Sequence, residues 1–131
     1  MSSIFSKIVS KEIPSHTVAE DENYLAFLDI NPLQEGHTLV IPKQETDYLF
    51  DLDDETYAGL FNFAKRVAKA IEAVVECKRI GIAVVGFEVP HAHIHLIPID
   101  DIYDIDFKKE RVKMSEEEFG ATAEKIRVRF S

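Results

Sequence analysis

The most informative stretch of this 131-residue sequence is Pro90-His91-Ala92-His93-Ile94-His95-Leu96-Ile97-Pro98, on which the predicted fold depends. It holds three of the five histidines in the chain, one at every second position. Because side chains alternate between the two faces of a β-strand, a strand here would direct the three imidazoles to one face and the apolar side chains to the other. We therefore predict a strand over residues 89–99, with one face for chemistry and one for packing.

The segments around this stretch predict an α+β fold with an antiparallel sheet of about five strands. Runs of apolar and β-branched residues, bounded by proline, glycine, asparagine and aspartate, are typical of strands joined by short turns. Such connections favour antiparallel pairing, with helices covering one side of the sheet. Besides residues 89–99, strands are expected at residues 16–20, 24–28, 36–43 and 79–85.

Apolar residues at three- and four-residue spacing predict a short N-terminal helix, one long helix and a C-terminal helix. Acidic capping residues precede the long helix, and Ser115 has the spacing of a capping box with Glu118. Phe63 and Ala70 lie outside the main apolar stripe of the long helix and are compatible with a second buried face. The expected helical segments are residues 4–9, a stripe over residues 57–75, and residue 115 to about residue 125.

Composition narrows the classes of function. A chain of this length with 46% hydrophobic residues suits a single domain over residues 1–131. Its 15 basic and 24 acidic residues give a net charge of −9, which disfavours a nucleic-acid polymer as partner, so any phosphate must belong to a small ligand. Cys77 is the only cysteine, and no apolar run resembles a secretory signal or a membrane span. A cytoplasmic protein without a membrane partner is expected.

Three histidines on one strand face are compatible with three interpretations. They could bind a metal ion, because imidazole is the commonest metal ligand in proteins. They could carry out phosphoryl chemistry, with one ring attacking phosphorus while the others hold oxygens and pass protons. They could also be ordinary hydrogen-bonded histidines. The triad contains no cysteine, aspartate or glutamate, which favours phosphoryl chemistry, and we expect no metal ligand and no cofactor.

Residues 91–97 match the pattern His-φ-His-φ-His-φ-φ, in which φ is apolar, and so resemble the signature of the histidine-triad (HIT) superfamily. The upstream blocks at residues 4–8, 11–14, 25–32 and 36–43 are similar to its nucleotide-binding hydrolase and transferase branch, in the same order. This resemblance implies one HIT domain and a homodimer. It also implies a hydrolase or nucleotidyl transferase acting at the α-phosphate of nucleoside phosphoramidates or dinucleoside polyphosphates and releasing a nucleoside monophosphate, with a purine nucleotide as the expected partner.

The resemblance also implies roles for individual residues. His93 would attack phosphorus and form a covalent nucleotidyl-histidine (phosphohistidine) intermediate, and the carbonyl of His91 would orient its other ring nitrogen. His95 would hold a phosphate oxygen, and His37 would join the histidine hydrogen-bond network. Asp29 would accept hydrogen bonds from the ribose hydroxyls. The side chains expected to enclose the base are Phe5, Ile8, Phe27 and Ile30.

Two departures from the family pattern affect these expectations. Many members carry Cys-x-x-Cys near the N-terminus, where this chain has Ser3 and Ser6, and Glu45 stands where a further histidine ligand often follows, so we predict no structural zinc. Phe87 and Glu88 replace the usual glutamine and serine or threonine before the triad. The carboxylate of Glu88 would repel phosphate when ionised, or act as a general acid when protonated.

Two other functions are also compatible with the sequence. The first is a nucleotide-binding module with little catalysis, because Phe87 and Glu88 replace groups that contact phosphate in relatives. The second is a divalent-metal hydrolase that uses the three histidines as ligands.

Overall fold

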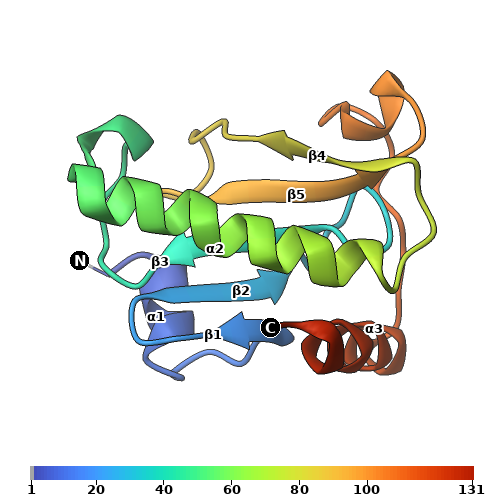
Figure 1. Cartoon of the computed structure of the whole chain (residues 1–131), viewed down its shortest axis with the longest axis horizontal. Helices are drawn as coiled ribbons and strands as arrows, with labels where there is room; N and C mark the ends of the chain where they lie inside the picture. Colours follow the sequence, from blue (N-terminus) through green and yellow to red (C-terminus); the bar gives the residue numbers. More distant parts are fainter. Residues whose placement is uncertain (1) are drawn as a thin grey trace.

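The computed structural model describes residues 2–131, and it contains a five-stranded antiparallel sheet with three helices (Figure 1). The strand order is β1-β2-β3-β5-β4, and each neighbouring pair is antiparallel. The α+β class and the five-stranded sheet predicted from the sequence are confirmed. The elements are α1 (Ile4–Val9), β1 (Thr17–Glu20), β2 (Tyr24–Leu28), β3 (Thr38–Pro42), η1 (Leu49–Asp51), α2 (Asp54–Glu72), β4 (Arg79–Ala83), β5 (Ile94–Ile99), η2 (Ile102–Ile105) and α3 (Glu116–Arg129).

The strand predicted over residues 89–99 is wrong in its first half, because β5 begins only at Ile94. Of the three triad histidines, His95 alone therefore lies in a regular strand. Pro90 has no N–H to offer a neighbouring strand, and the N–H of Ala92 donates to the carbonyl of Thr46, 2.7 Å away, in a loop. On the other side, β4 ends at Ala83, opposite His95, so the residues before Ile94 have no partner there.

Helices cover both faces of the sheet, so the prediction that they cover only one is wrong. The helices α2 and α3 pack on one face, and α1 packs on the other at one end of the sheet (Figure 1). Strand β2 shows the alternation that this requires, since Ala26 and Leu28 belong to the core under α2 whereas Leu25 and Phe27 belong to the core under α1. All five residues of β2 are buried because both of its faces are covered.

The C-terminal helix is longer than predicted and closes the core beside α2. Ser115 caps it with the predicted box to Glu118, but the helix continues to Arg129, because Ile126 extends its buried side. Phe63 and Ala70 of α2, expected to be left for a second surface, are each only 2% exposed. The ring of Phe63 packs between neighbours from β2 and from the segment after α3, so its burial is completed within this chain.

The same alternation places the chemical side chains on the α1 face. Ile94 and Leu96 of β5 belong to the core under α2, which directs His95 to the opposite face. His37, just before β3, is brought there by a tight turn at Gly36, whose φ of +91° favours glycine. A Cβ on Gly36 would also lie 2.9 Å from a methyl carbon of Val75. Within residues 2–131, no helix combines the length and the apolar character needed to cross a bilayer.

Candidate active site

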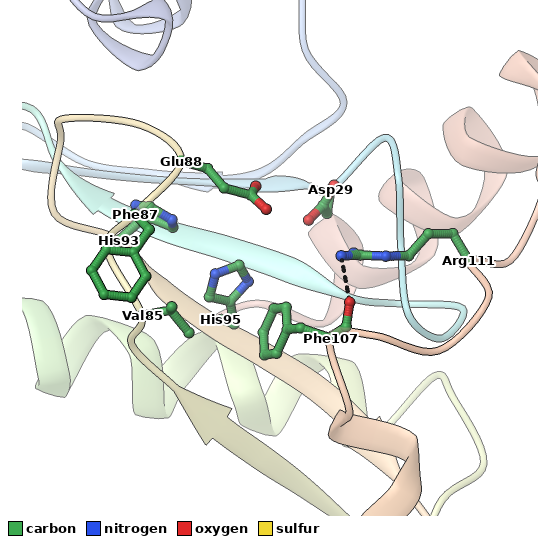
Figure 2. A pocket seen from close by; sticks show the side chains of 9 residues that line it. Asp29, Val85, Phe87, Glu88, His93, His95, Phe107 and Arg111 are labelled. Atoms are coloured by element: carbon green, nitrogen blue, oxygen red, sulfur yellow. Dashed lines mark hydrogen bonds between the residues drawn. The ribbon is translucent and has the colours of Figure 1, made fainter.

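A cleft on the α1 face brings together residues from widely separated parts of the chain (Figure 2). It encloses about 150 Å³ and adjoins an apolar hollow of about 230 Å³, so that together they reach the size typical of small-molecule sites. Asp29, Glu88, His93 and His95 line both spaces. The cleft is completed by Val85, Gly86, Phe87, Phe107 and Arg111.

The four residues expected to enclose the base all line the apolar hollow, together with other side chains such as Ile13, Leu39 and Val89. Phe5 and Ile8 come from the buried side of α1, and Phe27 comes from the facing side of β2. Phe5 contacts Phe27 and His93 edge to face, with ring centroids 5.4 and 5.0 Å apart. Ile30 also lines the hollow but is 74% exposed, so it lies at the rim.

His93 has one ring nitrogen fixed by the backbone and one available to the cleft. Its Nδ1 lies 2.7 Å from the carbonyl oxygen of His91. A carbonyl can only accept a hydrogen bond, so Nδ1 carries the proton. In the neutral ring, Nε2 therefore holds the lone pair, and the side chain lines the cleft (Figure 2). This tautomer has the form that a nucleophilic imidazole requires.

A second hydrogen-bonded chain fixes the tautomers of His37 and His95. The N–H of Leu33 donates to Nδ1 of His37 at 3.0 Å, so His37 carries its proton on Nε2. That Nε2 lies 3.0 Å from Nδ1 of His95 and donates to it. The proton of His95 is consequently on Nε2. His95 thus offers the cleft an N–H donor without a positive charge.

Burial keeps this pair of rings neutral. Burial lowers the pKa of His37 to about 3, with a further contribution from His95, and burial together with His93 lowers the pKa of His95 to about 3. One carboxylate oxygen of Asp29 lies 3.6 Å from Nε2 of His37, and this contact is between a charge and a neutral ring. Burial raises the pKa of Asp29, while the N–H of Asn31 opposes that rise.

His91 does not reach the cleft, although the sequence placed it on the same face as His93. Its ring is fully buried, its Nε2 donates to the carbonyl of Pro42 at 2.8 Å, and its Nδ1 accepts from the hydroxyl of Ser3 at 3.0 Å. Ser3 also caps α1 by accepting from the N–H of Ser6. This contact ties the N-terminal helix to the triad segment.

The positions compared with zinc ligands form a hydrogen-bond network. The hydroxyl of Ser6 and the N–H of Ser3 both donate to one oxygen of Glu45 at 2.6 Å, and these bonds lower the pKa of Glu45 to about 2. Serine hydroxyls are poor replacements for the thiolates that zinc prefers. These residues therefore do not fit a structural zinc ion.

The geometry also disfavours a metal site built on the three triad histidines. Both ring nitrogens of His91 are engaged away from the cleft, so the three rings do not converge on one point. Donor atoms of Asp29, His37 and His95 do lie within 4.8 Å of one another. In that group, however, both ring nitrogens of His37 and one of His95 take part in hydrogen bonds that an ion would have to break.

Phe107 and Arg111 line the cleft, and the sequence analysis assigned neither of them to the site. Phe107 packs its ring edge to face on His95, with centroids 4.8 Å apart, and Arg111 enters the cleft beside Asp29 (Figure 2). They follow β5 and belong to no motif. The one available signal was the concentration of basic residues at positions 108–113 in an acidic chain. Glu88 does lie at the cleft, as expected.

Comparisons with known proteins agree with the fold. The HIT domain family matches residues 10–102. An adenosine 5′-monophosphoramidase of Schizosaccharomyces pombe is 39% identical over 129 residues, covering 96% of both chains. An uncharacterized HIT-like protein of Borreliella burgdorferi is 42% identical over 102 residues, covering 72% of this chain and 73% of its own. The crystal structure of a Hit-like protein involved in cell-cycle regulation from Bartonella henselae has a TM-score of 0.84 at 32% identity, covering 98% of this chain and 96% of its own. The chain therefore belongs to the HIT family.

The neutral histidine pair predicts that the protein loses stability on acidification. In the unfolded chain His37 and His95 bind protons below about pH 6.5, whereas in the folded protein they stay neutral to about pH 3. The unfolded state therefore binds more protons between these values, and the free energy of unfolding falls by about 1.4 kcal/mol per ring for each unit of pH lost. Urea unfolding between pH 6.5 and 5 measures this slope. His37→Gln should make it shallower, and an identical slope in the variant would contradict the assignment.

Proposed function

We propose that this protein is a nucleotide hydrolase that cleaves at the α-phosphate of nucleoside phosphoramidates or dinucleoside polyphosphates and releases a nucleoside monophosphate. The observation that carries the proposal is the unprotonated Nε2 of His93, which faces a cleft that adjoins an apolar hollow of the size for a base. Membership of the HIT family and the adenosine 5′-monophosphoramidase named among its relatives support the same reaction class.

The proposed reaction has two displacements at phosphorus. In the first, Nε2 of His93 forms a bond to phosphorus while the bond to the leaving nitrogen or oxygen breaks, and the leaving group takes up a proton. In the second, water forms a bond to phosphorus, gives up a proton, and the bond to Nε2 breaks. Two smaller barriers replace one larger barrier, provided that the site holds phosphorus in line with the attacking nitrogen.

The surrounding residues supply the remaining roles in this proposal. The Nε2–H of His95 donates to a phosphate oxygen, and its neutral partner His37 maintains that tautomer. Asp29 accepts hydrogen bonds from the ribose hydroxyls beside the apolar hollow. Glu88, ionised in the free protein, would take up a proton with the substrate bound, give it to the leaving group and then recover one from water, since this residue lines both the cleft and the hollow.

The direct test is hydrolysis of an adenosine phosphoramidate and a diadenosine polyphosphate by the purified protein. We expect release of adenosine monophosphate and, after rapid quenching, a covalent adduct of one nucleotidyl group on His93 by mass spectrometry. His93→Ala should lose activity by a factor on the order of 10³ or more and form no adduct. His16→Gln is the matched control, because His16 stacks on Phe119 and pairs with Glu116 outside the cleft, and it should retain activity.

Other outcomes of this experiment select the alternatives. Binding of adenosine monophosphate without turnover of either substrate would identify a nucleotide-binding module. Full turnover by the His93→Ala variant, or activity that a chelator abolishes, would contradict the covalent mechanism.

The proposal includes a homodimer joined along β4. This strand is at one edge of the sheet, and an exposed edge is a template for pairing with another strand. Exposed apolar side chains surround it, including Ile82, Val85 and Phe87, which are 51, 48 and 94% exposed. A second copy of the chain would cover this edge by continuing the sheet.

Sedimentation equilibrium tests the dimer. The wild-type protein should have twice the mass of the chain, and Ile82→Lys should shift it toward the monomer, because a charge would be buried at the edge-to-edge contact. Val128→Lys is the control and should leave the mass unchanged, since Val128 is 71% exposed on α3, which packs against β1 at the opposite edge of the sheet. A monomeric wild-type protein would contradict the proposal.

A further inference from the structure

Residues 106–112, called the strap below, close the cleft on the side of Asp29. The strap is tied to the loop of residues 29–37, which carries both Asp29 and His37. Nζ of Lys109 donates to the side-chain oxygen of Gln34 at 2.6 Å, and the N–H of Val112 donates to the carbonyl of Pro32 at 2.9 Å. The strap therefore forms one wall of the cleft, and hydrogen bonds to the loop of residues 29–37 hold it there.

Arg111 is the member of the strap that enters the cleft. One terminal nitrogen of its guanidinium group donates to the carbonyl of Asn31 at 2.9 Å. The other donates to the carbonyl of Phe107 at 3.2 Å, the bond drawn in Figure 2. These bonds use two of the five N–H donors of the side chain. The guanidinium carbon also lies 5.8 Å from the centre of the Phe107 ring. These contacts fix the positively charged guanidinium group of Arg111 at one position in the cleft.

Asn31 links this guanidinium group to Asp29. Its carbonyl accepts from Arg111, while its N–H donates to one carboxylate oxygen of Asp29 at 2.8 Å. Figure 2 shows Arg111 extending into the cleft toward Asp29, with Glu88 reaching toward Asp29 from the opposite side. Moving Arg111 would therefore disturb both the charge near Asp29 and the turn that orients it.

The charges around Asp29 show why a cation is needed there. Burial raises the pKa of Asp29 and Glu88 adds to that rise, whereas the N–H of Asn31 lowers it most, followed by Arg111 and then His93. His37 is in contact but neutral, so it adds no compensating charge. Among the described residues that line the cleft, Arg111 is the only lysine or arginine. A buried carboxylate without such a neighbour favours its protonated form.

We propose that Arg111 is a positioning residue that holds Asp29 as an ionised carboxylate aimed at the ribose hydroxyls of the substrate. This inference rests on the proposed function, in which Asp29 accepts hydrogen bonds from those hydroxyls. A carboxylate accepts through both oxygens and forms charge-assisted bonds, which are about twice as strong as neutral ones. The strap thereby makes the site selective for ribonucleotides over nucleotides that lack the hydroxyls.

The test compares kcat/KM for an adenosine phosphoramidate and for its 2′,3′-dideoxyadenosine counterpart. The wild-type protein should prefer the ribose substrate. Arg111→Gln should reduce that preference about tenfold at the acidic end of the pH range in which the protein is active, through KM rather than kcat, because the hydrogen bonds to Asp29 weaken in the ground state and the transition state alike. The preference of this variant should recover as the pH is raised and Asp29 ionises, and Arg111→Lys should restore part of it at the acidic end.

Lys108→Gln is the matched control, because it removes the same charge from an exposed position on the strap and should leave the preference unchanged. An equal loss on both substrates in Arg111→Gln would show a merely structural role and overturn the inference. An unchanged ribose preference at every pH, or a wild-type protein that does not distinguish the substrates, would also overturn it. No turnover of either substrate by the wild-type protein would instead refute the proposed function.

Discussion

The hydrogen bond from the backbone N–H of Leu33 to Nδ1 of His37 is the constraint on which the chemistry of this site depends. A backbone amide can only donate, so it determines where the proton of His37 lies. Because His37 carries its proton on Nε2, it donates to Nδ1 of His95. His95 must then carry its own proton on Nε2, which faces the cleft. The loop that precedes β3 therefore determines which nitrogens of His37 and His95 donate hydrogen bonds and which accept them.

The structure separates the histidines into two systems with different tasks. One system is the neutral, hydrogen-bonded pair of His37 and His95, against which the ring of Phe107 packs. This pair can donate a hydrogen bond to the cleft without adding a positive charge. The other is His93, whose Nδ1 is held by the carbonyl of His91. The ring of His91 serves the fold, since it joins α1 to the triad segment through Ser3. In an acidic chain, the cleft thus brings uncharged N–H donors and one arginine close together.

The sequence predicted much of the fold and site, and its errors have physical causes. Alternating histidines located the chemical segment, yet Pro90 and a loop contact to Ala92 prevent the strand from including His91 and His93. Periodicity indicated the buried sides of α1 and β2, because it is a local property of the sequence, whereas the expectation that Phe5, Ile8 and Phe27 line one hollow came from the family resemblance. The contribution of Phe107 and Arg111 depends instead on how the segment after β5 folds back over the loop at Asp29, which no local pattern records.

The most direct measurement of the central claim is the protonation of the ring nitrogens, observed by ¹⁵N NMR at pH 8 with histidine-substituted variants for assignment. The account predicts proton-bearing Nε2 and bare Nδ1 for His37 and His95, and the opposite tautomer for His93. An imidazolium signal from His37 or His95, or a His93 ring protonated on Nε2 with Nδ1 bare, would contradict it.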